Sequence, residues 1–290
     1  MKVLPFKIPK TGRESFRVQV DQANYFYDTL HNHDELQITF IVKSEGTLIC
    51  GDYIGNFSAG DLFIIGSGQP HVLRNNKEYF EDSSTGAHAI SLFFDKHSFG
   101  HEFFRLPELE NLHAFLNRTQ RGLRFSKSVS VSIVSLLLTM EQQTGLDRLI
   151  NLLKVLQIVS NTKAYEYLAS ASQFDSYNEK EGKRMNQIFQ FTMQEYHRVI
   201  LLDEVASLAN MTPNAFCRYF KQRTRKTYVS FLNEIRISKA CELIKATELT
   251  VAQACYQSGF NNLSHFNRIF KKVRGCSPSE YAKKATHSFQ

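Results

Sequence analysis

The chain of 290 residues lacks the sequence features of secreted, membrane-spanning and disulfide-stabilised proteins. Its first residues carry positive charge but no apolar segment follows them, and the most apolar stretch, residues 129–140, is broken by three serines. Its five cysteines are odd in number and never spaced as C-x-x-C, which argues against a disulfide framework and against a zinc knuckle. We therefore expect a cytoplasmic protein that has no membrane partner.

The sequence also lacks the usual signatures of catalysis. It contains no activated serine or cysteine, no phosphate-binding glycine loop and no paired acidic residues in a catalytic arrangement. We therefore expect no enzyme activity and no cofactor. Long polar runs are absent as well, and hydrophobic residues make up 42% of the chain. Both facts predict folded domains, and a chain of this length suits two of them.

Positive charge is concentrated in the last part of the chain. Residues 181–290 contain 17 lysines and arginines against 8 acidic residues, a net charge of +9, whereas the remainder has a net charge of −2. Such an asymmetry is typical of a protein in which one domain binds a polyanion and the other does not.

The two parts of the chain also differ in periodicity. Short strand-like runs separated by turn residues occupy residues 14–94 and predict a small antiparallel β-barrel or sandwich. These runs are Leu36–Val42, Thr47–Cys50, Asp61–Ile65 and Ala89–Phe94. Apolar residues then recur on one helical face, at Leu146, Leu149, Leu153, Leu156 and Val159. This helix packs either within its own subunit or in the seam of a homodimer.

A polar, aperiodic stretch at residues 170–182 has the composition of an exposed linker, and helical segments follow it. The expected helices are Met185–Arg198, Asp203–Ala209, Pro213–Gln222, Tyr228–Ala246, Val251–Ser258, Leu263–Val273 and Pro278–Lys284. Capping residues mark the starts of several of these helices. Thr212, Thr250 and Asn262 stand at N-cap positions, and Ser277 begins a capping box. The expected fold class is therefore α+β multidomain, with an all-α C-terminal domain.

The C-terminal region contains an internal duplication. A shift of fifty residues aligns Phe216 with Phe266 and Phe220 with Phe270, and it also aligns two basic pairs, Arg218 with Arg268 and Lys221 with Lys271. The phenylalanines at i and i+4 bury one helical face and leave the arginine between them on the flank. Recognition helices need this arrangement, and the intervening helix, roughly 28 Å long, could space two of them about one DNA turn apart.

Three segments, residues 211–224, 233–244 and 259–281, resemble the AraC/XylS family of transcription regulators. The resemblance implies a double helix-turn-helix domain that binds double-stranded DNA, with RNA polymerase as a further partner of an activator. It places base reading on Asn214, Cys217 and Arg218 of the first unit and on Leu263, Ser264, Asn267 and Arg268 of the second. Phosphate contacts are expected from Lys221, Arg223, Lys271, Lys272 and Arg274.

Two departures distinguish the first unit. Gly275 stands where the second recognition helix ends, but Arg225 stands at the matching position of the first, so we expect the first exit turn to differ. Cys217 is also a poorer hydrogen-bonding residue than glutamine or arginine. We therefore expect the first unit to read sequence less strictly than the second.

Histidines of the N-terminal part resemble the two motifs of cupin barrels. His31, His33 and Gln37 match the first motif and His71 the second, although Gln37 replaces the expected acidic ligand and Gly66 a proline. Three interpretations remain open: residues retained without a ligand, an effector pocket, or a metal site on His31, His33 and His71, the least favoured. A pocket could also use Tyr25, Tyr27 and Arg74, and the family resemblance implies a sugar as effector.

We thus predict a cupin-like effector-binding barrel at residues 1–95, a helical extension for possible dimerisation at 96–169, a linker at 170–182 and a DNA-binding domain at 183–290. The predicted function is sequence-specific transcription regulation under the control of a small effector. A metal-dependent cupin enzyme with a basic tail and a nonspecific architectural DNA-binding protein are the alternatives.

Overall fold

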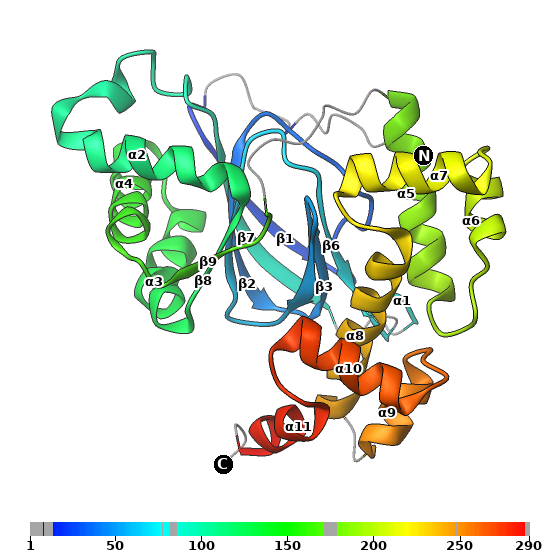
Figure 1. Cartoon of the computed structure of the whole chain (residues 1–290). Helices are drawn as coiled ribbons and strands as arrows, with labels where there is room; N and C mark the ends of the chain where they lie inside the picture. Colours follow the sequence, from blue (N-terminus) through cyan, green and yellow to red (C-terminus); the bar gives the residue numbers. More distant parts are fainter. Residues whose placement is uncertain are drawn as a thin grey trace. The chain divides into compact units, whose positions relative to one another are not determined.

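The computed structural model (Figure 1) describes residue 8 and residues 14–76, 78–81, 86–170, 179–246 and 249–287. Contacts divide the chain into two compact units, residues 2–182 and residues 183–290. The predicted linker at 170–182 lies mostly outside the described residues. In the described part of the chain, no helix is both long enough and apolar enough to cross a membrane.

The first unit is built on two antiparallel sheets. Six strands lie in the order β1-β7-β2-β5-β8-β9, and three lie in the order β4-β3-β6. The strands are β1 (Arg17–Ala23), β2 (Leu36–Lys43), β3 (Gly46–Cys50), β4 (Tyr53–Phe57), β5 (Leu62–Ile65), β6 (His71–Asn75), β7 (Ala87–Phe94), β8 (Leu123–Phe125) and β9 (Tyr165–Tyr167). The expected antiparallel β-rich region is confirmed, and β2, β3, β5 and β7 overlap the four runs singled out in the sequence.

The two sheets pack face to face around a shared core. Ile41 and Phe63 from the larger sheet and Leu48 and Phe57 from the smaller one belong to the same buried cluster. Within the residues described, the strands form this pair of sheets and no closed barrel. The sandwich alternative of the sequence prediction therefore describes the strand arrangement better than the barrel does.

Helices cover the outer face of the six-stranded sheet (Figure 1). These helices are α2 (Glu110–Arg118), α3 (Lys127–Gln142) and α4 (Gly145–Asn161). The first unit also contains four short helices, which are α1 (Glu78–Glu81), η1 (Phe103–Arg105), η2 (Pro107–Leu109) and η3 (Thr119–Arg121). Strand alternation divides β2 between two cores, because Leu36, Ile38 and Phe40 face these helices. The intervening Gln37 and Thr39 therefore face the space between the sheets.

Within its own unit, α4 buries only part of the apolar face predicted for it, and the homodimer seam stays a prediction. Val155, Leu156 and Val159 are buried, but Leu146 is 69% exposed. Leu146 lies in the first turn of α4.

The second unit is all helical. Its helices are α5 (Glu179–Glu195), α6 (Leu202–Leu208), α7 (Pro213–Thr224), α8 (Tyr228–Ala246), α9 (Val251–Gln257), α10 (Leu263–Arg274) and α11 (Pro278–His287). Each overlaps one of the seven predicted segments, and α8 has the predicted bounds. The predicted caps are confirmed as well, since the side chains of Thr212, Thr250 and Asn262 accept backbone N–H groups at the starts of α7, α9 and α10.

Helix α8 belongs to two aromatic cores. Near its start, Phe231 contacts Phe189 and Phe220, with ring centroids 4.9 and 5.3 Å away. Towards its end, residues such as Ile237 and Cys241 join Phe266 and Phe270 in a second buried cluster. This double burial explains why α8 has apolar residues around its whole circumference, and it fixes α7 and α10 to one common helix.

Candidate nucleic-acid interface and a buried histidine cluster

Two helix-turn-helix units, α6–α7 and α9–α10, repeat the same turn. Asn210 and Gly259 adopt positive φ angles of 53° and 91° at its sharpest point. The next residue donates a backbone hydrogen bond back to the first helix, from Met211 N to Ala206 O at 2.9 Å and from Phe260 N to Cys255 O at 3.2 Å. The same backbone motif thus sets the angle between the helices in both units.

The exit turns of α7 and α10 also match, which corrects the expectation drawn from Arg225. Arg225 has φ 59° and ψ 8°, close to the 74° and −6° of Gly275, and each donates its N–H to the carbonyl four residues earlier. The first unit therefore keeps the left-handed cap with a non-glycine residue, at an energetic cost of about 1 kcal/mol.

The outward faces of α7 and α10 carry most of the side chains predicted to read bases. Six of the seven are exposed, namely Asn214, Cys217, Arg218, Ser264, Asn267 and Arg268. The seventh, Leu263, is partly buried and packs against the core of the second unit. Behind these faces, Phe216, Phe220, Phe266 and Phe270 are fully buried. The duplication thus produces two helices with rigidly seated inner faces and polar outer faces.

The predicted phosphate contacts fall into two groups. Lys221, Lys271 and Lys272 are exposed, whereas Arg223 and Arg274 are half-buried. Burial raises the pKa of the Cys241 thiol on α8, and the nearby charge of Arg274 opposes that rise. Arg274 therefore interacts within the protein, whereas the three lysines are the more exposed candidates for the predicted phosphate contacts.

Arg236 is a structural residue that the sequence did not reveal. Its guanidinium donates from Nε to Tyr196 O at 2.8 Å and from Nη2 to Arg198 O at 2.7 Å. Gly259 lies against the same segment, where a Cβ would come within 2.2 Å of Tyr196 O. Arg236 thereby ties the loop between α5 and α6 to α8. No local sequence pattern signals such a long-range contact.

In the first unit, four of the predicted pocket residues converge. One ring nitrogen of each of His31, His33 and His71 lies within 4.8 Å of the others. The amide oxygen of Gln37 lies 3.0 Å from both His33 Nε2 and His71 Nε2. Burial lowers the pKa of all three imidazoles, that of His31 to about 4, so the rings are neutral at pH 7. These four residues form the histidine cluster.

Hydrogen bonds extend the histidine cluster into the sheet. Gln37 Nε2 lies 2.7 Å from Thr39 Oγ1, which in turn lies 2.8 Å from Ser91 Oγ on the neighbouring strand. The sequence prediction omitted Thr39 and Ser91. Thr39 could have been found, because strand alternation places it on the same face as Gln37.

The remaining predicted pocket residues are less uniformly placed. Tyr27 contacts His31 edge-on, with ring centroids 5.1 Å apart. Arg74 alternates with His71 along β6, so it lies on the opposite face of that strand, where it is 3.5 Å from Asp28. Tyr25 packs against Phe80 with tilted rings whose centroids lie 4.3 Å apart, and the Arg74 guanidinium lies 5.6 Å from the centroid of the same Phe80 ring. Tyr27 thus lies beside the histidine cluster, whereas Tyr25 and Arg74 form a separate group around Phe80.

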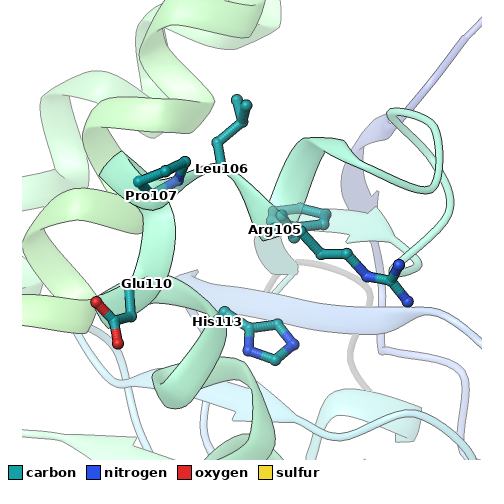
Figure 2. A pocket seen from close by; sticks show the side chains of 6 residues that line it. Arg105, Leu106, Pro107, Glu110 and His113 are labelled. Carbon is teal, nitrogen blue, oxygen red and sulfur yellow. The ribbon is translucent and has the colours of Figure 1, made fainter.

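A surface hollow of about 330 Å³ also occurs in the first unit (Figure 2). Its lining comes from η1, η2 and α2: Phe104, Arg105, Leu106, Pro107, Glu110 and His113. The hollow shares no residue with the histidine cluster. In Figure 2 the carboxylate of Glu110 and the guanidinium of Arg105 point in opposite directions and do not converge, which does not indicate a specific ligand.

Comparisons with known proteins match a family model within the second unit and curated relatives along most of the chain. Residues 205–284 match the model of a helix-turn-helix domain family. The uncharacterized HTH-type transcriptional regulator YdeC of Bacillus subtilis is 23% identical over 92% of this chain and 90% of its own. The HTH-type transcriptional activator RhaR of Mannheimia succiniciproducens is 22% identical over 87% of this chain and 86% of its own.

Solved structures are similar too. The DNA-binding domain of AdpA, solved in complex with a target DNA, covers 35% of this chain with 91% of its own length, at 20% identity and a TM-score of 0.34. ToxT from Vibrio cholerae covers 94% of this chain with 98% of its own, at 17% identity and a TM-score of 0.37.

Proposed function

The chain carries an AraC-type helix-turn-helix domain, and from this premise we propose that it is a sequence-specific transcription regulator controlled by a small effector. The observation that carries the proposal is the pair of recognition helices. Both α7 and α10 bury two phenylalanines in a core. At the positions to which the AraC/XylS resemblance assigns base contacts, they expose asparagine, serine or arginine. Asparagine suits adenine and arginine suits guanine in the major groove.

The surrounding charge supports the same function. The net charge of +9 in residues 181–290 favours a polyanion, and exposed Lys221, Lys271 and Lys272 lie near the ends of α7 and α10. Contacts from lysine to phosphate supply affinity without sequence information, so they complement the base-reading side chains. A regulator that activates transcription would also contact RNA polymerase.

The first unit is the proposed sensor. Its two packed sheets and the histidine cluster are consistent with the cupin-like domain implied by the histidine motifs. An effector bound there would change DNA affinity through unequal binding to two states of the protein. A sugar is the effector class that the family resemblance implies, and a homodimer is the assembly in which such a change would act.

Binding to selected DNA tests this function. The purified full chain is used to select fragments of its own genome, and the bound fragments are then competed against random duplex of equal length. We expect a preference of at least 10³-fold for selected DNA, since specific sites bind regulators more tightly than random DNA by about that factor or more. Equal affinity for both would instead identify a nonspecific architectural protein.

A further inference from the structure

The two helix-turn-helix units meet at a second place besides helix α8. Gly259, in the turn between α9 and α10, lies against the loop between α5 and α6. A Cβ atom at this position would clash with the backbone oxygen of Tyr196 and lie only 3.0 Å from His197 Cα. Both opposing atoms belong to the backbone, so neither moves aside by a change of side-chain rotamer. The turn of the α9–α10 unit therefore packs directly on the loop that leads into the α6–α7 unit.

Arg236, near the middle of α8, completes this contact. Its guanidinium donates to Tyr196 O at 2.8 Å and to Arg198 O at 2.7 Å. The same guanidinium lies 5.8 Å from the ring centroid of Phe260, the residue after Gly259. Its Nε atom lies 2.9 Å from the point that a Cβ of residue 259 would occupy. One side chain thus contacts the loop before α6 and the turn before α10, and these five residues form the Arg236 clamp.

The close approach of the two backbones, rather than the turn itself, requires the glycine at position 259. Asn210 holds the equivalent place in the α6–α7 unit, where it adopts a positive φ of 53° without being glycine. Asparagine tolerates this conformation better than most residues, so the turn alone does not require glycine. Asn210 is exposed, whereas a Cβ at Gly259 would meet the loop. Glycine therefore serves the contact between the two units.

The chemistry of the clamp suits arginine better than lysine. A guanidinium holds its N–H donors in one plane, so it serves two carbonyls in fixed directions, whereas a lysine ammonium on its flexible stem rotates. Hydrogen bonds from a charged donor are roughly twice as strong as neutral ones. Burial lowers the pKa of Arg236, which reflects the cost of keeping this charge away from water. The two carbonyls offset that cost only while the loop stays in place.

Helix α8 by itself would hold the two recognition helices less precisely. Its nineteen residues span about 28 Å, and helices of such length curve. A bend of about 10° at the middle would displace one end by roughly 2.5 Å relative to the other half. Hydrogen bonds to base edges tolerate changes in donor–acceptor distance of only about 0.5 Å. A brace at the middle of α8 therefore controls whether both helices can read bases at once.

We propose that Arg236 and Gly259 fix the separation and relative rotation of α7 and α10, and thereby set the spacing between the two DNA segments that the chain reads. Both are positioning residues, because they lie on α8 and in a turn and act through the recognition helices. The spacing of the DNA segments rests on the proposed regulatory function, whereas the rigid placement of the two helices does not. Such a clamp excludes DNA that carries the right bases at the wrong separation.

Distance measurement on the full chain without DNA tests the placement. Nitroxide labels are attached to native Cys217 on α7 and to Val273→Cys on α10, both exposed positions, in a Cys276→Ser background that leaves the other cysteines buried. An excess of unlabelled chain removes distances between copies. Double electron–electron resonance should give one narrow distribution, and its width should at least double in Arg236→Lys and in Gly259→Ala. An unchanged width in Arg236→Lys would overturn the proposal, even where Gly259→Ala fails to fold.

Binding to spacing variants of the selected DNA tests the consequence. One inserted base pair moves a segment by about 3.4 Å and turns it by about 34°. The unmodified chain should lose at least tenfold in affinity on this insertion. Arg236→Lys should bind the original spacing more weakly but lose less than threefold on the insertion. Loss of folded protein would lower affinity for every spacing equally, so the ratio between spacings separates positioning from folding. An unchanged ratio in Arg236→Lys would contradict the proposal.

Asn210→Ala is the matched control, because alanine there has the strain of a positive φ at an exposed position. It should keep the narrow distance distribution and the spacing ratio of the unmodified chain. Broadening equal to that of Gly259→Ala would assign the effect to turn strain and overturn the role of Gly259.

The two measurements also separate this proposal from the regulatory function. A chain whose distances broaden in Arg236→Lys but which shows no preference for selected DNA would overturn the regulatory function alone. A chain that prefers its selected DNA but has the same spacing ratio with and without Arg236 would overturn the role of the clamp alone.

Discussion

Helices α7 and α10 occupy equivalent places in the two helix-turn-helix units and share one burial pattern through their first ten residues. Their outer faces differ. The first presents Cys217 where the second presents Asn267, and Gln222 where the second presents Lys272. The duplication has therefore kept the inner scaffold while the surface that would meet DNA diverged. We infer that the second unit reads bases more strictly and holds phosphates more firmly.

The inner scaffolds should contribute equally to stability. Phe220 and Phe270 are fully buried among aromatic rings, so Phe220→Ala and Phe270→Ala should each lower the free energy of unfolding by about 3–5 kcal/mol. Chemical denaturation followed by circular dichroism measures this. Val229→Ala, at a side chain 61% exposed, is the control and should change stability by less than about 0.5 kcal/mol. A loss confined to one of the phenylalanines would break the equivalence of the two cores.

The outer faces should contribute unequally to specificity. Arg268→Ala should lower affinity for selected DNA by about 1–3 kcal/mol and relax the preference at one base pair, because bidentate contacts to guanine carry that discrimination. Arg218→Ala should have a smaller effect, since its neighbour Cys217 adds little hydrogen bonding. Competition binding against single-base variants of the site measures both. If the Arg268→Ala protein lost the same affinity for selected and for random DNA, base reading by Arg268 would be contradicted.

Substitutions in the turns that end α7 and α10 should change the stability of the two units by a smaller amount. Gly275→Ala should destabilise the second unit by about 1 kcal/mol, because alanine disfavours the left-handed conformation that glycine adopts there. Arg225→Gly should stabilise the first unit by up to about 1 kcal/mol for the same reason. Arg225→Ala removes the side chain but retains the strain, so it is the matched control. Stabilisation by alanine equal to that by glycine would show that side-chain interactions of Arg225, rather than its φ angle, set the effect.

The smallest effect is expected from a single phosphate contact. Lys272→Ala should weaken binding to selected and random DNA alike and reduce the slope of log affinity against log salt by about 0.9. Lys96→Ala, an exposed lysine of the first unit, is the control and should leave the slope unchanged. The salt dependence of fluorescence anisotropy provides the measurement. An unaltered slope for Lys272→Ala would remove Lys272 from the phosphate contacts.

The helical unit was far more predictable from sequence than the sheet unit. Signals for helix ends are local, and Thr212, Thr250 and Asn262 cap the helices that they were expected to cap. The sheets depend on pairing between distant strands, so the three-residue strands β8 and β9 left no periodic pattern to detect. Periodicity likewise identified the apolar face of α4 but not how far its burial extends, since Leu146 at one end of that face is 69% exposed.

The candidate sites were likewise predictable where they depend on local helical spacing and less so where they depend on contacts between distant residues. Fixed helical spacing placed Arg218 and Arg268 on exposed faces, as the duplication predicted. Convergence of His31, His33 and His71 was also foreseen. Arg74 was offered as a further polar contact of the same pocket, although strand alternation places it on the opposite face of β6 from His71.

Rotation of one half of the selected DNA site relative to the other tests the central claim most directly. If α7 and α10 read two successive major grooves from one face of the duplex, an insertion of about five base pairs between the two contacted segments turns one of them to the far side. We expect affinity of the full chain for that DNA to fall to nearly that for random duplex, whereas substitutions of the same central base pairs without insertion should have little effect. Unchanged affinity after the insertion would contradict simultaneous reading by the two helices.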